Sequence, residues 1–174
     1  LPPTLAQAEQ EYLSFVQTNL APKTYEVYAK TLKHLREFLG NKSVGVVSGR
    51  EIELYKIERR AKVSAHTVNH ELRGIRAFFN KLKQWDFITK NPCDGVKDIR
   101  IIDTIRPYLS KDDLRRLLDH TAGTQLHDII LLAAMTGLRR GEILNLTWED
   151  IDLQRGTILV RSSIAYQTKA GKIR

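Results

Sequence analysis

The chain has 174 residues, of which 42% are hydrophobic and 28% charged, so it can form one or two folded domains with a core. A net charge of +8 favours a polyanionic partner, either nucleic acid or an anionic membrane surface. The longest apolar run, residues 129–135, is too short to span a bilayer, and neither a metal site nor an internal disulfide is expected from scattered histidines and one cysteine.

Four helices are predicted within the first 85 or so residues, because each follows a recognisable start signal. The signals are Thr4 with Gln7, Pro22, Ser48 with Glu51, and Ser64. The second and fourth helices carry apolar stripes at helical spacing, which must be buried against other helices. We therefore expect residues 1–94 to form a four-helix bundle. The stripes are Tyr25, Tyr28, Leu32, Leu35 and Leu39, then Val68, Leu72, Ile75, Phe79 and Leu82.

The pattern changes after the fourth helix. Asn91-Pro92 ends the bundle, because the residue before a proline is pushed out of helical conformation. Residues 95–107 show no periodicity and are predicted to be an interdomain linker. A capping box of Ser110 and Asp113 then opens a second domain, residues 108–174. Its expected elements are helices at about 110–120, 126–136 and 139–147, a strand over Thr157–Val160, and a hairpin turn at Gly171.

One face of the fourth helix combines basic and amide side chains opposite its apolar stripe. Arg and Lys neutralise phosphates, while Asn and Arg can hydrogen-bond base edges in a major groove. The start of the helix also attracts phosphate through its backbone N–H groups. Solvated charge is nevertheless the common role of such residues, so the face alone permits either interpretation. The candidate DNA contacts are Asn69, Arg73, Arg76, Asn80 and Lys83 on this face, His66 and Thr67 at its start, and Lys23, Lys30 and Lys62 elsewhere in the bundle.

The most specific stretch runs from Thr136 to Asp152. Gly137 should break one helix just before another begins, and Arg139 and Glu142 face the same side because they are three residues apart. An arginine near a helix start, oriented by a carboxylate, is well placed to bind two oxygens of a phosphate. A purely structural ion pair is the alternative interpretation. The residues expected to anchor this helix in the core are Ile143, Leu146 and Trp148.

This stretch resembles the first-arginine signature of the tyrosine recombinases (the phage integrase family), which begins Thr-Gly-Leu-Arg and continues to Glu-Leu, Leu, Trp and Asp-Ile-Asp. Residues 67–92 resemble the end of the family's core-binding domain, Pro107–Ser110 the entry to its catalytic domain, and Thr168–Arg174 the hairpin with its catalytic lysine. The resemblance implies a mainly α fold. It would comprise a four-helix, SAM-like core-binding bundle followed by the start of a mixed α/β catalytic domain.

The resemblance also implies catalytic roles. Arg139 would bind the non-bridging oxygens of the scissile phosphate, Glu142 would support it, and Lys169 would donate a proton to the leaving 5′ oxygen. Arg140 and Lys172 are the runners-up to Arg139 and Lys169. The family's His-x-x-Arg motif and its tyrosine nucleophile lie downstream of the hairpin, past Arg174. No tyrosine of this chain is nominated as the nucleophile, and we expect the 174 residues to bind duplex DNA without cleaving it.

The activity implied by the resemblance is site-specific DNA recombination or integration through a 3′-phosphotyrosyl intermediate, without metal or other cofactor. The partners would be double-stranded DNA and further copies of the enzyme, a tetramer at full length, in a cytoplasmic, nucleoid-associated setting of a prokaryote or phage. One alternative is a non-catalytic DNA-binding regulator or competitor built on the same bundle. Another is a helical protein-interaction module, for which loss of Arg73 and Arg76 would leave partner binding intact.

Overall fold

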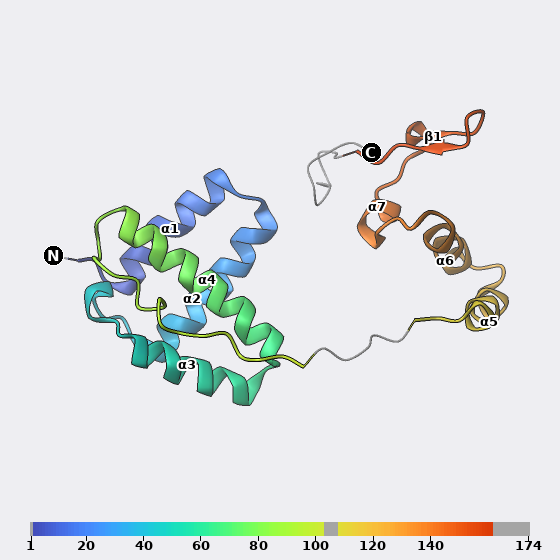
Figure 1. The fold of residues 1–174 in the computed structure, drawn as a ribbon. Coiled ribbons are helices and arrows are strands. Elements are labelled where there is room, and N and C mark those ends of the chain that lie inside the picture. Colours follow the sequence, from blue (N-terminus) through green and yellow to red (C-terminus); the bar gives the residue numbers. More distant parts are fainter. Residues whose placement is uncertain (1, 103–107, 162–174) are drawn as a thin grey trace. The chain divides into compact units, whose positions relative to one another are not determined.

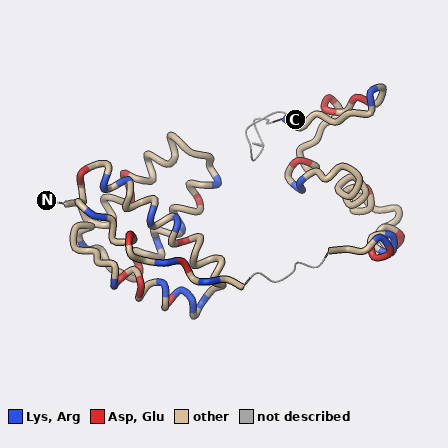
Figure 2. Tube along the Cα trace, in the orientation of Figure 1, with Lys and Arg blue, Asp and Glu red and all other residues tan. Residues whose placement is uncertain are grey.

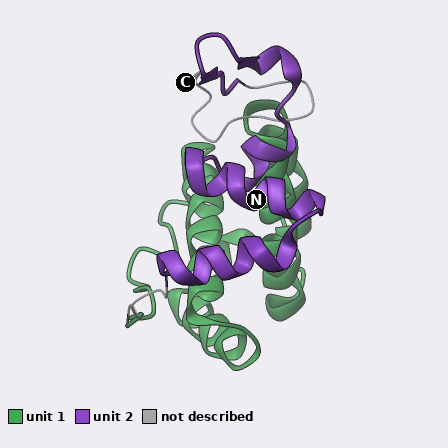
Figure 3. Cartoon of the chain, turned by 90° about the vertical axis from the view of Figure 1, so that its right-hand side faces the viewer, with its two compact units in different colours: residues 1–104 green, residues 105–174 purple. Residues whose placement is uncertain are grey.

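The computed structural model describes residues 2–102 and 108–161, which belong to two compact units. Unit 1 comprises Leu1–Thr104 and unit 2 comprises Ile105–Arg174, coloured separately in Figure 3. Unit 1 is a helical bundle, and unit 2 has helices followed by a small β-hairpin (Figure 1). The mainly α fold predicted from the sequence is therefore confirmed.

The four predicted helices of unit 1 are all present. They are α1 (Leu5–Asn19), α2 (Pro22–Leu39), α3 (Gly49–Lys62) and α4 (Ala65–Gln84), with a short 3-10 helix, η1 (Val44–Val46), before α3. Thr4 and Ser48 each cap a backbone N–H three residues later, and Gln7 and Glu51 return the bond to the cap residue. Ser64 of α4 accepts a hydrogen bond from the Thr67 backbone N–H, without the reciprocal bond. The starts of these helices follow from local hydrogen bonding that the sequence displays.

Helix α4 packs against α1, α2 and α3 and supplies much of the core (Figure 1). Its predicted stripe of Val68, Leu72, Ile75, Phe79 and Leu82 is fully buried. The α2 stripe is buried at Leu32 and Leu35 and partly buried elsewhere. Gly74 lets α2 and α4 approach closely, because a β-carbon there would lie 3.3 Å from the ring of Tyr28. A larger residue at this position would push the two helices apart.

A buried carboxylate, Glu71 of α4, ties three helices together. It accepts two hydrogen bonds from Arg59 of α3 (2.8 and 2.6 Å) and one from the Tyr55 hydroxyl (2.9 Å). His34 Nδ1 of α2 lies 3.5 Å from the same carboxylate. Burial alone would raise the pKa of Glu71, but the hydrogen bonds from Arg59 and Tyr55 outweigh it and lower that pKa. The carboxylate is therefore held in its charged form inside the bundle.

The predicted linker does not begin where periodicity ends. Residues 91–99, here called the strap, run back along the bundle after α4, and the compact unit continues to Thr104 instead of ending at residue 94. The side chain of Asn91 donates to the backbone oxygen of Arg76 (3.1 Å) and to Asn80 Oδ1 (2.8 Å). Val96 is buried and Ile99 packs against the core. The strap follows the bundle because these apolar side chains and amides have partners there.

Unit 2 contains α5 (Lys111–Thr121), α6 (Gln125–Thr136), α7 (Arg140–Leu144), the 3-10 helix η2 (Trp148–Asp150), β1 (Ile151–Asp152) and β2 (Thr157–Ile158). The first two helices lie within a residue of their predicted bounds. The strands are antiparallel, with Ile151 opposite Ile158, and Gly156 occupies the turn at a φ of 63°. This confirms a strand at 157–158, whereas the partner strand was not predicted. The predicted turn at Gly171 lies outside the described residues.

The prediction that Trp148 anchors α7 in the core is wrong. Helix α7 ends at Leu144, so Trp148 does not lie on its inner face and is 81% exposed. Ile143 is buried, as predicted. A capping arrangement between Thr147 and Asp150 starts the separate 3-10 helix that carries Trp148.

Replacing Arg59 with Ala should destabilise the protein strongly, because Glu71 would remain buried without its cationic partner. Breaking a buried pair in this way costs about 3 kcal/mol in free energy of unfolding. The matched control is Lys62→Ala on the same helix, whose pair with Glu58 is exposed and worth about 0.5 kcal/mol. Urea unfolding of both variants measures the difference, and equal losses would contradict the role given to Glu71.

Glu71→Gln should change how stability depends on pH. Because folding lowers the pKa of Glu71 below its ordinary value of 4.5, its stabilisation is complete above that value and is lost as the pH falls towards the folded-state pKa. The variant should be less stable at pH 6 and should lose less stability than the wild type between pH 5 and pH 3. Urea unfolding at several pH values tests this, and identical acid slopes would argue against it.

Candidate phosphate-binding and nucleic-acid sites

Arg139 occupies the junction between α6 and α7. Gly137 ends α6 in the left-handed conformation, at a φ of 66°, and Arg139 is the N-cap residue of α7. Glu142 binds this residue twice, because one carboxylate oxygen accepts from the Arg139 backbone N–H and the other from guanidinium Nη1, each at 2.9 Å. The sequence therefore predicted this pair correctly from its spacing alone.

The two members of this pair differ in exposure. The Glu142 side chain is 3% exposed, whereas the Arg139 side chain is 56% exposed. A buried carboxylate thus orients a guanidinium that solvent can reach, and a guanidinium carries five N–H donors in a planar fork. Such a group can bind a phosphate with the donors that Glu142 does not use. Arg140 is also exposed, but it has no such carboxylate partner in the described part of unit 2.

Arg161 takes part in an ion-pair network that sequence reasoning missed. Its guanidinium bonds to Asp150 at 2.5 Å and to Glu149 at 3.1 Å, joining η2 to the end of the hairpin. Hydrogen bonds from Thr147, followed by the contacts with Arg161, lower the pKa of Asp150. Because Arg161 pairs with Glu149 and Asp150, we assign these three residues the structural role of holding the hairpin in place. Lys169 and Lys172 lie outside the described residues.

The basic face predicted on α4 is partly covered by the strap, at Asn69 and Arg76. Asn69 is 4% exposed, and its amide donates to the backbone oxygen of Ile99 and accepts from the Ile99 N–H, both at 2.8 Å. The predicted position of Asn69 on an exposed face is therefore wrong. Arg76 donates to the backbone oxygen of Val96 (3.0 Å) and to Asp98 (3.2 Å). Helical spacing identified the face correctly but could not reveal what covers it.

The other residues nominated on α4 differ in accessibility. Arg73 is well exposed and lies 3.9 Å from Asp98, and Asn80 is exposed but accepts a hydrogen bond from Asn91. Lys83 is exposed and has no carboxylate partner among the residues that the structure describes. These side chains are therefore divided between the strap and the surface instead of forming one continuous binding face.

A groove of about 550 Å³ lies between α2, the end of α3 and the start of α4. It collects three of the nominated residues, Lys30, His66 and Thr67, all of which are exposed. Lys23 and Lys62 do not line it and pair with Glu26 and Glu58 on their own helices. The remaining lining residues are Val27, Thr31, His34, Arg59, Val63, His70 and Glu71. This groove therefore combines basic and imidazole side chains with the start of a helix.

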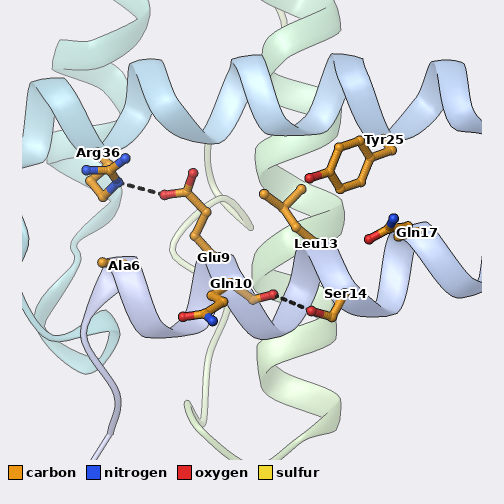
Figure 4. Close-up of a pocket in the computed structure, with 8 residues that line it drawn as sticks. All are labelled: Ala6, Glu9, Gln10, Leu13, Ser14, Gln17, Tyr25 and Arg36. Carbon is orange, nitrogen blue, oxygen red and sulfur yellow. Dashed lines mark hydrogen bonds and ion pairs between the residues drawn. The ribbon is translucent and has the colours of Figure 1, made fainter.

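Basic and acidic residues are interspersed along α2 and α3 of unit 1, most visibly on α3 (Figure 2). A second hollow, of about 430 Å³, lies between α1 and α2 (Figure 4). It contains the ion pair of Arg36 with Glu9, at 2.7 Å, and otherwise neutral side chains. It is therefore a poorer site for a polyanion than the α2–α4 groove.

One His-x-x-Arg sequence does occur in the chain, at His70 to Arg73, and was not recognised from the sequence. It lies on α4 of unit 1 and precedes the Arg139 motif in the sequence, whereas the His-x-x-Arg motif of the family follows the Arg139 motif. Its arginine lies beside Asp98.

No three His, Cys, Asp or Glu side chains gather as a metal site in residues 2–102 and 108–161. No helix within those ranges is long and apolar enough to cross a membrane.

Comparison with known proteins places both units in one protein family. Residues 5–88 match the phage integrase N-terminal SAM-like domain, and residues 107–174 match the phage integrase family. The chain belongs to the phage integrase family of tyrosine recombinases, as its motifs indicated.

Individual relatives agree with this assignment. The chain is 27% identical to a XerC-like tyrosine recombinase of Caldanaerobacter subterraneus over 88% of its own length and 41% of the relative. Among solved structures, a lambda integrase dimer bound to a core site gives a TM-score of 0.81 at 20% identity, covering 98% of this chain and 47% of the other. The Tn1549 transposon integrase gives 0.77 at 24%, covering 99% and 59%. The chain spans less than half of the XerC-like and lambda proteins.

Proposed function

We propose that this chain forms part of a site-specific tyrosine recombinase, in which unit 1 binds duplex DNA and Arg139 binds the scissile phosphate. The pairing of Arg139 with Glu142 carries the proposal. A buried carboxylate fixes the backbone and the guanidinium of an arginine whose other donors remain accessible. The family assignment makes phosphate the expected ligand of that arginine.

The chemistry of strand exchange suits this geometry. Attack on a phosphodiester builds negative charge on the non-bridging oxygens, and a positively charged donor already held in place stabilises it without further reorganisation. Glu142 supplies that preorganisation as a positioning residue. Lys169 is proposed as the general acid that protonates the leaving 5′ oxygen, on the strength of its place in the sequence motif alone.

Duplex DNA is the proposed partner of unit 1, and its binding surface is assigned to the α2–α4 groove. Lys30, His66 and Thr67 lie together there, and the exposed Lys23 and Lys62 belong to the neighbouring ends of α2 and α3. The lambda integrase structures contain DNA, one as a tetramer on a Holliday junction. By analogy we propose that the full enzyme assembles on DNA in several copies, in the cytoplasm of a prokaryote or phage-infected cell.

The nucleophile is proposed to come from outside these 174 residues, because the family places its tyrosine beyond the catalytic hairpin. Without a nucleophile no phosphotyrosyl bond forms, so this chain should bind DNA without cleaving it. A non-catalytic DNA-binding regulator is the second candidate. It shares unit 1 and is favoured if the product of the whole gene also fails to cleave.

The role of Arg139 can be tested in the whole gene product with a suicide DNA substrate. Arg139→Ala should lower the rate of covalent adduct formation ~100-fold or more, because it removes a charge donor to the transition state. Arg139→Lys should recover part of that rate, since the charge remains but the planar fork is lost. Arg140→Ala is the matched control and should cleave normally. An active Arg139→Ala enzyme, or a covalent adduct formed by the 174 residues alone, would overturn the assignment.

The DNA surface of unit 1 can be located from the salt dependence of duplex binding, measured by fluorescence anisotropy. Each phosphate contact contributes about −0.9 to the slope of log K against log salt. Lys30→Ala should therefore reduce the slope by about 1, because Lys30 lines the groove. The matched control is Lys90→Ala, which removes an exposed cation outside the groove and should leave the slope unchanged. Equal effects of the two variants would contradict binding at the groove.

A further inference from the structure

We propose that Asn69 and Arg76 are positioning residues that clamp the strap, so that the tether between the two units begins after Ile99 and not at the end of α4. The proposal gives these residues a role different from DNA contact. It rests on the proposed function only in its consequence, because a tether matters when both units act on one DNA duplex.

The Asn69 side chain matches one residue of extended backbone. Its amide nitrogen donates to the Ile99 oxygen and its amide oxygen accepts from the Ile99 N–H, both at 2.8 Å. A carboxamide carries the same donor and acceptor as a peptide group, so it can satisfy both polar atoms of Ile99 at once. Because Asn69 is buried, losing this arrangement would leave polar groups unsatisfied away from water. The bond pair is therefore a strong restraint on the position of Ile99.

Arg76 holds the strap about two turns further along α4. Its guanidinium donates to the backbone oxygen of Val96 at 3.0 Å and to Asp98 at 3.2 Å. Arg73 lies 3.9 Å from the other oxygen of Asp98. Both bonds come from Nη2 of Arg76, so this side chain has a role in holding the strap besides the phosphate contact predicted for it.

The strap is also held by its own apolar side chains and by α3. Cys93 and Val96 are buried in the core of unit 1, at 1% and 6% exposure. From the α3 side, Lys56 donates to the backbone oxygen of Lys97 at 3.1 Å. The strap is thus fixed from two helices and from beneath, and its last hydrogen bonds to the bundle within residues 91–102 are those of Ile99.

This position sets the length of the tether to unit 2. Ten residues, 100–109, separate Ile99 from Ser110, the N-cap of α5. If the strap were released after Asp94, fifteen residues, 95–109, would separate Asp94 from Ser110. At ~3.4 Å per extended residue, these lengths reach roughly 35 and roughly 50 Å. A shorter tether keeps a second binding unit at a higher effective concentration once the first has bound.

The test is a distance distribution between the units, measured by double electron–electron resonance on the chain as it exists. Spin labels go on Glu11→Cys of α1 and Arg115→Cys of α5, both exposed positions. Cys93 should remain unlabelled, because burial raises the pKa of its thiol to about 12. Adding Asn69→Ala together with Arg76→Ala should extend the distribution to distances up to ~15 Å longer, since up to five residues, 95–99, lose their side-chain clamp to α4. Gln84→Ala, at an exposed position on the same helix, is the matched control and should leave the distance distribution unchanged.

Hydrogen exchange separates this role from a general loss of stability. In Asn69→Ala, protection of the Ile99 amide should fall ~10-fold or more while the core amides of Ile75 and Phe79 keep theirs. An unchanged distance distribution in a variant whose Ile99 is unprotected would overturn the proposal, as would undiminished protection of Ile99. If the core amides lose protection, Asp98→Asn provides the same test from the surface, since it loosens the Arg76 contact without touching the core. None of these measurements needs DNA, so failure of the recombinase assignment would leave them intact.

Discussion

Helix α4 contacts α1, α2, α3 and the strap. The packing of unit 1 therefore depends on which side of α4 each of these elements occupies. One side buries the apolar stripe against α1 and α2, and Gly74 permits a close approach to Tyr28. Another side presents Glu71 to Arg59 of α3, which keeps a charged group inside the bundle. A third side holds the strap. The first turns of α4 line the α2–α4 groove, which is why the DNA surface is assigned there.

Local and periodic features of this fold could be predicted from the sequence, because their causes lie within a few residues of each other. The capping boxes and the apolar stripes are of this kind, and so is the Arg139–Glu142 pair, whose members are one helical turn apart. The strap could not be predicted in this way. Asn69 and Ile99 are thirty positions apart, and a single side chain pairing with a backbone leaves no periodic signal in the sequence.

The candidate site shows the same division. The sequence identified Arg139 and its supporting carboxylate, yet it treated Asn69 and Arg76 as exposed because helical spacing reports a face and not its neighbours. It also missed Arg161, whose partners Glu149 and Asp150 become close only when the hairpin folds back. Trp148 was expected in the core for a related reason, since its exposure depends on where α7 ends.

The clamp on Ile99 also bears on how this protein can be divided into pieces. A helical unit cut at residue 94, where sequence periodicity and proline suggest a boundary, would keep Asn69 but remove its backbone partner. It would also remove Val96, opening part of the core next to Cys93. A piece ending at Arg100 or later would retain both. The natural unit of folding therefore extends several residues beyond its last helix, and truncation series or domain swaps should place their junctions accordingly.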